Sequence, residues 1–365
     1  MKKISKFLLV LLMAFSLAGC SCSSDECKCP TDETTTNESE YVTINNGYKD
    51  LYKQTVQSVV MVKVQRKTNG EIKSTGSGVV IMEEGSSAYV VTNAHVLKDF
   101  TSDFEVEIFF SDEEGFMSGK SEIAKVVGKD YNEDVAVLEI NKSTKYKVAT
   151  LGDSSSVEKG DFVYTIGSPY QKFNHTTSGN ISNYNVKIGI DMVNTGVVTP
   201  VYAILFDAAI NKGNSGGALF DSEGKLIGIT TLRYDELNGV YGALPINYFM
   251  KVAKHLIAND ENLPYYVRPV VNLTLLSINE MGTMREKYGI SDSITTGVYV
   301  QNSLEGSIGA QSIITEINNV KVNSTAEFNV ELLKYSVGET VILTLINKDG
   351  LNTRQVAVTL RSWLK

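Results

Sequence analysis

A serine flanked by glycines has the surroundings in this sequence that point most directly to chemistry. Ser215 lies in the segment 211–219, which reads Asn-Lys-Gly-Asn-Ser-Gly-Gly-Ala-Leu and falls between two predicted strands. Glycines on both sides allow a tight loop that exposes the hydroxyl. Backbone N–H groups, those of Gly213 and Ser215, can converge there on a carbonyl oxygen that gains negative charge. The segment predicts a nucleophilic serine with an oxyanion hole.

A histidine and an aspartate elsewhere supply the other groups that a serine nucleophile needs. His95 comes just after an apolar strand-like run at residues 90–92, and Asp134 comes just before the apolar run 135–140. A neutral histidine can accept the serine proton. A carboxylate on its other ring nitrogen fixes the tautomer and stabilises the imidazolium.

Each of these segments alone also fits an ordinary structural role. Glycine-rich serine loops are common turns, and a single His or Asp beside a strand is usually structural. Their order along the chain is His, Asp, Ser, with separations of 39 and 81 positions. That order is expected of chymotrypsin-like double barrels, whereas other serine hydrolase folds use other orders. Together, the three segments predict a catalytic triad of His95, Asp134 and Ser215.

The other histidines and one nearby aspartate are predicted to be structural. His175 falls in a polar stretch that we predict as a loop. His255 lies near the end of a predicted helix, where a cation suits the helix dipole. Asp207 is close to the serine segment in sequence, but a structural role is favoured for it.

The pattern of short strands predicts a mainly β protein with two domains. The first, residues 47–259, begins with a short helix at 49–57 and closes with a helix at 246–257. Between them, short runs rich in Val, Ile and Tyr alternate with turn signals, which is typical of a barrel or sandwich. The predicted strands are 59–65, 76–81, 88–91, 105–110, 123–127, 135–140, 162–166, 204–206, 218–220 and 226–231.

The second predicted domain, residues 260–365, is smaller and mixes strands with a helix. A Ser/Thr cap favours a helix over 324–335, and strands are predicted at 297–301, 313–322, 340–347 and 354–360. The length of 365 residues leaves room for two domains, and 42% hydrophobic with 21% charged residues is typical of globular proteins. Because the net charge is −8 and no long basic run occurs, nucleic acid is not an expected partner.

The amino terminus has the pattern of an export signal. Three Lys residues precede the apolar run 7–17, which is too short to span a bilayer comfortably. The run ends in Leu-Ala-Gly-Cys, which resembles the lipobox of bacterial lipoproteins. We therefore expect a signal peptide over 1–19, a lipid on Cys20 and a disordered tether over 20–46, rather than a plain secretory signal. The predicted location is the cell envelope, anchored by lipid to the outer face of the cell membrane.

All cysteines of the chain lie close to this predicted anchor. They occupy positions 20, 22, 27 and 29, so the predicted domains contain no disulfide. The spacing of Cys27 and Cys29 is not a usual zinc pattern and no histidine is near. Exposed thiols or a local disulfide are favoured over zinc, and no metal or cofactor is predicted.

Residues 50–258 resemble the HtrA/DegP family of trypsin-like serine proteases. The resemblance rests on the motifs Thr-Asn-Ala-His-Val at 92–96, Asp-Val-Ala-Val-Leu at 134–138 and Asp-Ala-Ala-Ile-Asn at 207–211, which runs into Gly-Asn-Ser-Gly-Gly. Thr-Gly-Ser-Gly-Val-Val at 75–80 and Ile-Gly-Ser-Pro-Tyr at 166–170 support it. The resemblance implies a chymotrypsin-like double β-barrel with His95 as general base, Asp134 as its orienting group and Ser215 as nucleophile. It also implies an oxyanion hole formed by the N–H groups of Gly213 and Ser215.

The same resemblance gives an expectation for the primary specificity pocket. In trypsin-like proteases the base of this pocket lies six residues before the nucleophile, which is Ala209 here, next to Ile210. Ile229, Thr230 and Thr231 are expected on the opposite wall. A pocket without a carboxylate should accept small or medium aliphatic side chains and reject charged ones, because a buried charge without a partner is costly.

The second domain resembles the PDZ domain that follows the protease in this family. The segments 313–322 and 337–345 carry the resemblance, whereas residues 270–275 lack the expected glycine and residues 303–313 are shorter than usual. A PDZ domain binds extended carboxyl-terminal peptides by strand addition. Peptide binding and a purely structural or regulatory role both remain open.

The expected function is that of a serine endopeptidase that cuts unfolded or mislocalised proteins. Family members are commonly trimers, so a homotrimer is implied. Two alternatives are a lipoprotein binding module or chaperone whose oxyanion loop is misformed, and a serine esterase. The esterase is disfavoured because no Gly-x-Ser-x-Gly elbow surrounds Ser215.

Overall fold

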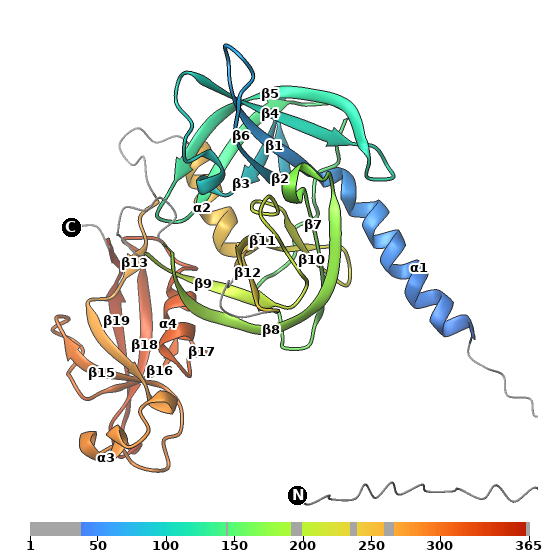
Figure 1. Ribbon diagram of the computed structural model, residues 1–365. Coiled ribbons are helices and arrows are strands. Elements are labelled where there is room, and N and C mark those ends of the chain that lie inside the picture. The colour runs from blue at the N-terminus through green and yellow to red at the C-terminus, as the bar shows by residue number, and fades with distance from the viewer. Residues whose placement is uncertain (1–37, 144, 191–198, 234–238, 259–265, 363–365) are drawn as a thin grey trace, which may run out of the picture. The chain divides into compact units, whose positions relative to one another are not determined.

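The computed structural model describes residues 38–143, 145–190, 199–233, 239–258 and 266–362 (Figure 1). The predicted signal peptide and the predicted lipidation site at Cys20 lie outside these residues, as do the other three cysteines. Within them, no helix is both long enough and apolar enough to cross a membrane.

The first barrel is closed by six antiparallel strands in the order β1-β2-β3-β6-β5-β4. Alternate side chains along each strand point inward and form an apolar core that includes Val60, Val62 and Val64. The strands are β1 (Val59–Arg66), β2 (Ile72–Glu84), β3 (Ser87–Thr92), β4 (Phe104–Ser111), β5 (Met117–Asp130) and β6 (Val135–Asn141).

The second barrel is also closed by six strands, in the order β10-β11-β12-β9-β8-β7. Its strands are β7 (Phe162–Gly167), β8 (His175–Ile190), β9 (Thr199–Phe206), β10 (Ala218–Asp221), β11 (Leu226–Arg233) and β12 (Tyr241–Pro245). Two closed six-stranded barrels are the arrangement of chymotrypsin-like proteases, so the predicted fold class is confirmed.

The two barrels share one apolar core. It combines Val79 and Val91 of the first barrel with Ile166 and Leu244 of the second, and Phe249 of helix α2 (Ile246–Ala258) packs into it. All five side chains are essentially inaccessible to solvent. The closing helix predicted from sequence is therefore present, and it joins the barrels into one packed body.

Helix α1 (Glu38–Thr55) begins earlier than the sequence analysis predicts. Its first residues belong to the segment 20–46 that was expected to be a disordered tether. Helix formation is cooperative, and the carboxyl-terminal half of α1 is anchored to the barrels by Tyr48, Leu51 and Tyr52. The Tyr48 hydroxyl lies 2.7 Å from Oγ1 of Thr176.

The carboxyl-terminal domain is a six-stranded sheet covered by helix α4. Five of its strands follow the order β14-β15-β16-β18-β19, and β17 pairs with β16 beside this path. Ser324 caps α4 by accepting the N–H of Glu327 at 3.2 Å, as the sequence predicts. The remaining elements are the 3-10 helices η1 (Val56–Ser58), η2 (Ala94–Leu97), η3 (Pro169–Gln171) and η4 (Ile278–Glu280), helices α3 (Met284–Tyr288) and α4 (Thr325–Leu332), and strands β13 (Pro269–Val270), β14 (Leu273–Ser277), β15 (Val298–Ser303), β16 (Ile313–Ile317), β17 (Val320–Lys321), β18 (Thr340–Ile346), β19 (Thr353–Thr359) and β20 (Arg361–Ser362).

Some predicted boundaries were wrong for identifiable reasons. The single strand predicted over 313–322 is a hairpin, because Asn318 and Asn319 adopt φ values of 47° and 68° and turn the chain between β16 and β17. His175 was predicted to fall in a polar loop, but it is the first residue of strand β8 and is paired with Gly167. The sequence of β8 is polar because much of this long strand is exposed, and closure of the barrel supplies its hydrogen-bonding partners.

Candidate active site

Strands β3 and β6 bring His95 and Asp134 together. The two strands pair in register, with Thr92 opposite Ala136, so the residues just beyond β3 lie beside those just before β6. Nδ1 of His95 is 3.0 Å from Oδ2 and 3.1 Å from Oδ1 of Asp134. The backbone N–H of His95 donates to the same carboxylate at 2.9 Å. This is the geometry by which a carboxylate orients an imidazole, with Nε2 left for the substrate side.

The electrostatics of this pair suit a general base. Burial opposes the charged imidazolium, but the charge of Asp134 and its hydrogen bond outweigh that effect, so the pKa of His95 is raised above 6.5. The Asp134 side chain is inaccessible to solvent, whereas 23% of the His95 side chain is exposed. Asp134 also adopts a left-handed backbone with φ of 55°, which is unusual for a residue other than glycine.

Ser215 sits on a sharp loop between the two barrels. It is half-buried, and the glycines near it, Gly213 and Gly216, have φ values of 104° and 84°. A Cβ at Gly213 would lie 2.7 Å from the carbonyl oxygen of Ser168, and a Cβ at Gly216 would lie 2.2 Å from that of Ser77. Only glycine fits these positions, for reasons of both space and conformation.

The peptide between Lys212 and Gly213 is held in one orientation. The Lys212 carbonyl accepts the N–H of Tyr170 at 3.0 Å. Because C=O and N–H point in opposite directions in a trans peptide, the N–H of Gly213 points away from Tyr170. No described residue accepts a hydrogen bond from the N–H groups of Gly213 or Ser215. An oxyanion hole requires donors of this kind, which supports the predicted role of these two N–H groups.

Ser77 of β2 ties the serine loop to the first barrel, a role that the sequence analysis missed. Its hydroxyl donates to the Gly213 carbonyl at 2.7 Å and accepts the N–H of Ser168 at 2.8 Å. Its own N–H donates to the Ser215 carbonyl at 2.8 Å, and Thr92 donates to its carbonyl at 2.7 Å. Every polar group of this fully buried residue is thus used. The available signal was a serine between two small residues, Gly76 and Gly78.

Asn93 makes a second bridge between the barrels. Its side-chain amide donates to the Asp134 carbonyl at 3.1 Å and to Oγ1 of Thr231 in β11 at 2.9 Å. Thr230 acts on the neighbouring loop, where its hydroxyl donates to the Asn214 carbonyl at 2.6 Å. Thr230 and Thr231 were predicted to line the specificity pocket. Their hydroxyls contact the Asn214 carbonyl and the side chain of Asn93.

The other residues predicted for that pocket lie in different environments. Ala209 is exposed, and its carbonyl accepts the hydroxyl of Thr177 at 2.8 Å. Ile210 packs in the apolar core of the second barrel, and Ile229 in the core that the barrels share. Asp207 accepts the N–H of Asn180 at 2.6 Å, which is a structural contact.

The two remaining histidines take no part in this site. His175 is exposed at the start of β8, and His255 lies in the last turn of α2 with its ring 5.9 Å from that of Tyr266. Among the described residues, no group of three or more His, Cys, Asp or Glu is placed to hold a metal ion.

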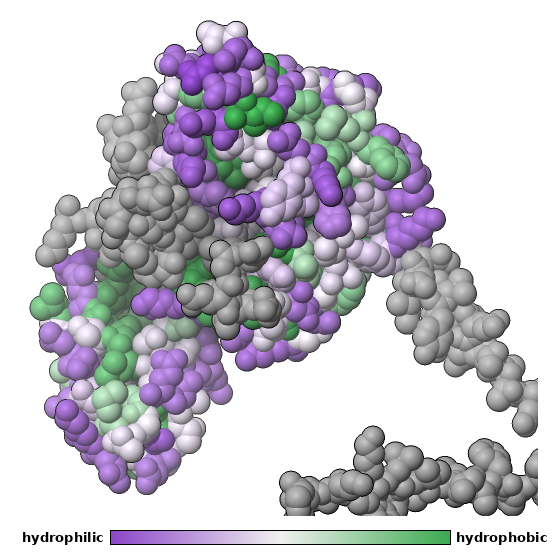
Figure 2. Space-filling model, in the orientation of Figure 1, coloured by the Kyte–Doolittle hydropathy of each residue, from purple (hydrophilic) through white to green (hydrophobic). Residues whose placement is uncertain are grey.

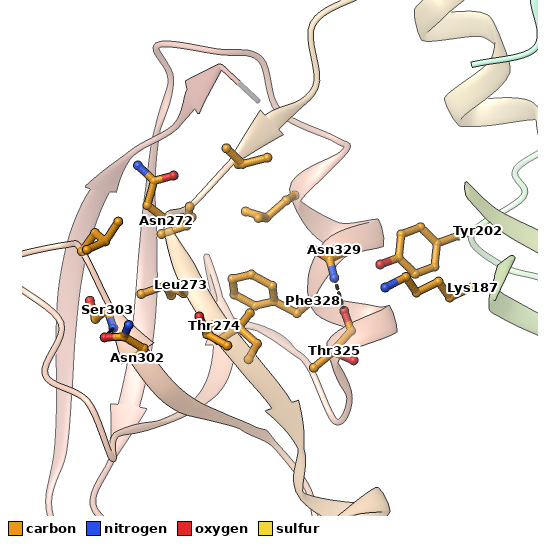
Figure 3. A pocket seen from close by; sticks show the side chains of 15 residues that line it. Lys187, Tyr202, Asn272, Leu273, Thr274, Asn302, Ser303, Thr325, Phe328 and Asn329 are labelled. Carbon is orange, nitrogen blue, oxygen red and sulfur yellow. Dashed lines mark hydrogen bonds between the residues drawn. The ribbon is translucent and has the colours of Figure 1, made fainter. Parts of the chain in front are cut away.

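A separate groove lies in the carboxyl-terminal domain, between edge strand β14 and helix α4 (Figure 3). Its volume is about 530 Å³. Phe328 and Leu273 lie at its centre in the close-up, and Lys187 and Tyr202 of the second barrel stand beside Asn329 of α4. The segment 270–275, which lacks the glycine expected of a PDZ domain, forms one of its walls.

Comparison with known proteins identifies the family of the chain. Residues 76–229 match a family model described as a trypsin-like peptidase domain. The chain is 32% identical over 302 residues to a serine protease Do-like HtrA of Lactococcus lactis, covering 78% of this chain and 71% of that protein. It is 28% identical over 324 residues to a Do-like HtrA of Bacillus subtilis, covering 85% and 69%.

Solved structures show the same fold. A structure of the HtrA-type protease AlgW with a tripeptide aligns with a TM-score of 0.61 and 23% identity, over 86% of this chain and 97% of that one. With the relatives above and the two closed barrels, this establishes the kind of protein. The chain belongs to the HtrA family of trypsin-like serine proteases and is a serine-type endopeptidase.

Proposed function

We propose that this endopeptidase cleaves unfolded or mislocalised proteins through His95, Asp134 and Ser215. One observation carries the proposal: the N–H groups of Gly213 and Ser215 are unpaired among the described residues and lie on the loop that Ser77 holds to the first barrel. The oriented pair of His95 and Asp134 supplies the base. Catalysis by such a constellation needs no metal or organic cofactor.

In the proposed reaction, the Ser215 hydroxyl attacks the carbonyl carbon of the scissile peptide bond while its proton moves to Nε2 of His95. The negative oxygen of the tetrahedral intermediate accepts the N–H groups of Gly213 and Ser215. His95 then gives its proton to the leaving nitrogen, the C–N bond breaks, and an acyl-enzyme remains. Water, deprotonated by His95, attacks the ester and releases the carboxylic acid product with regeneration of Ser215.

The proposed preference is for small or medium aliphatic residues before the scissile bond. Its support is chemical: position 209 holds Ala, so no carboxylate stands where trypsin-like enzymes receive Arg or Lys. Thr230 and Thr231 use their hydroxyls within the protein, as described above, and are not counter-charges for a cationic substrate. We further propose a lipid anchor on Cys20 at the outer face of the cell membrane, and assembly into a homotrimer.

The alternative of a binding module with a misformed oxyanion loop predicts an inverted peptide between Lys212 and Gly213. Inversion would turn the Lys212 carbonyl toward the substrate and fill the hole with an acceptor. The hydrogen bond from Tyr170 to that carbonyl favours the proteolytic reading.

The decisive experiment is cleavage of reduced casein by purified residues 30–365, beside Ser215→Ala. We expect cleavage that is lost in the variant, with cuts after Val, Ala, Ile or Leu, and covalent labelling of the wild type alone by a phosphonate probe. Equal casein cleavage by both proteins, also after heating and with added peptides, would contradict the protease proposal and favour the binding module.

The groove between β14 and α4 supports a second proposal, that the carboxyl-terminal domain captures extended peptides. β14 is an edge strand, so its outer hydrogen-bonding groups are open to strand addition. Figure 2 shows apolar surface on this domain, where Leu304 and Leu351 are each 80% exposed. Fluorescence anisotropy with peptides ending in a free carboxylate tests this, and equal binding of amidated peptides would contradict carboxylate capture.

A further inference from the structure

A buried ion pair lies next to the aspartate that orients His95. Glu133 immediately precedes Asp134, and its carboxylate is paired with the guanidinium of Arg268. Nε of Arg268 donates to Oε1 of Glu133 at 2.6 Å, and a terminal nitrogen donates to Oε2. The Tyr248 hydroxyl of α2 donates to the same carboxylate. The two charged side chains are only 10% and 3% exposed.

Arg268 lies beyond helix α2, in the segment that leads into β13. The same short segment makes a second contact with the turn at 130–134, because the N–H of Tyr266 donates to Oδ2 of Asp130 at 2.9 Å. Oδ1 of Asp130 in turn accepts the N–H of Glu133 at 3.2 Å. Residues 266–268, which we name the strap, therefore hold the side chains of Asp130 and Glu133.

The turn that the strap holds has little freedom of its own. Asp134 adopts its left-handed backbone directly after Glu133, a conformation that persists only when surrounding contacts determine it. A carboxylate buried as deeply as that of Glu133 is strongly disfavoured without its cation. Loss of the cation would drive Glu133 toward solvent, and the adjoining peptide would move with it.

We propose that Arg268 is a positioning residue for catalysis, which acts through Glu133 to hold the Asp134 carboxylate on His95. The inference rests on the proposed roles of His95, Asp134 and Ser215. It also places the functional end of the protease domain at the strap, beyond the boundary at residue 259 predicted from sequence. A protease domain ending at 259 would lack the cation that Glu133 needs.

The test uses residues 30–365 carrying Arg268→Met, Arg268→Lys or the pair Glu133→Gln with Arg268→Met. For Arg268→Met we expect kcat/KM on a peptide substrate to fall at least tenfold, through kcat rather than KM. Arg268→Lys keeps the charge without the two-point contact and should lose less activity. The double variant removes both charges, so it should recover to within about threefold of the wild type.

Lys63→Met serves as the matched control, because Lys63 forms a partly buried ion pair with Glu107 in the first barrel, away from the turn. It should leave kcat/KM unchanged. Arg268→Met with wild-type activity, or a double variant no better than the single one, would overturn the proposal. An equal loss of kcat/KM in Lys63→Met would also overturn the proposal, because it would show that the loss of any partly buried ion pair lowers activity.

A second readout separates this inference from the proposed function. In a Ser215→Ala background, the low-field proton NMR signal of the His95 Nδ1–H reports its bond to Asp134 without any turnover. We expect the signal to persist with Arg268 intact and to weaken or shift in Arg268→Met. If the wild type shows no cleavage that depends on Ser215, the proposed function fails. An unchanged signal in Arg268→Met refutes the positioning role alone.

Discussion

At the scale of single residues, Asp134 and Ser77 are buried and held in place by several hydrogen bonds each. Asp134 receives two hydrogen bonds from His95 and is closed to solvent. Ser77 makes four hydrogen bonds and is equally buried. Because an unsatisfied buried polar group costs about 1–3 kcal/mol, removing one partner disturbs the others more than the lost bond alone suggests.

The proposed role of His95 as general base, with its raised pKa, predicts the acid limb of the pH profile. In this role His95 must be neutral to accept the serine proton, so kcat/KM should fall as pH decreases through a pKa above 6.5. Asp134→Asn removes the charge that raises this pKa, so the limb should move to lower pH while kcat drops roughly 10³- to 10⁴-fold. A pH profile of peptide hydrolysis measures both effects. A limb that stays in place in Asp134→Asn would exclude Asp134 as the source of the raised pKa.

Ser77→Ala should weaken catalysis without unfolding the protein. The change releases the Gly213 carbonyl and the Ser168 N–H, so the oxyanion loop loses one of its two ties to β2. We expect kcat to fall about 10- to 100-fold with KM little changed, in the range seen when oxyanion stabilisation is impaired. Ser58→Ala is the control, because Ser58 is also buried but its hydroxyl donates to the Thr55 carbonyl of α1, not to the serine loop. Equal kinetics of the two variants would show that Ser77 has no special role.

At the scale of elements, short helices beside the strands hold several residues of the site and the groove in position. η2 presents His95, η3 supplies Tyr170 to hold the Lys212 carbonyl, and α4 forms a wall of the groove. η2 follows β3, η3 follows β7 and α4 follows β17, so the preceding strand fixes the position of each short helix.

The amino-terminal cap of α4 offers a test at this scale. Ser324→Ala removes the acceptor for the N–H of Glu327 and should lower the stability of the carboxyl-terminal domain by about 1 kcal/mol. Ser324→Asp retains an acceptor and should be near wild type. Chemical unfolding followed by circular dichroism measures the difference. If both variants lose the same stability, the cap contributes nothing through its hydrogen bond.

The sequence predicted most strands, and the triad of His95, Asp134 and Ser215 stays a prediction. It did not reveal the contacts that position these three residues. Strands such as β1 and β6 are apolar and local patterns reveal them. β8 is polar and long, and only its pairing with β7 and β9 makes it a strand. Ser77 meets Gly213, and Glu133 meets Arg268, across more than 130 positions of sequence. No local pattern encodes such pairs, because they arise from the closure and docking of whole barrels.

At the scale of the whole molecule, the protease is one cooperative body built around the core that its barrels share. Phe249 of α2 is fully buried in that core, beside side chains from both barrels. Phe249→Ala should lower the free energy of unfolding by about 3–5 kcal/mol and destabilise both barrels together. Hydrogen exchange followed by mass spectrometry would measure each barrel separately. Loss of protection in one barrel only would contradict a shared core.

The bridge from Asn93 to Thr231 has a consequence for the time at which the enzyme becomes active. His95 and Asp134 precede Ser215 in the chain, and Asn93 finds its partner only when β11 has been made and folded. A chain that emerges amino terminus first therefore presents the proposed base before the proposed nucleophile, and the bond from Asn93 to Thr231 forms last of the three. We expect proteolytic activity to appear only late in folding, which would protect the nascent protein from cleaving itself.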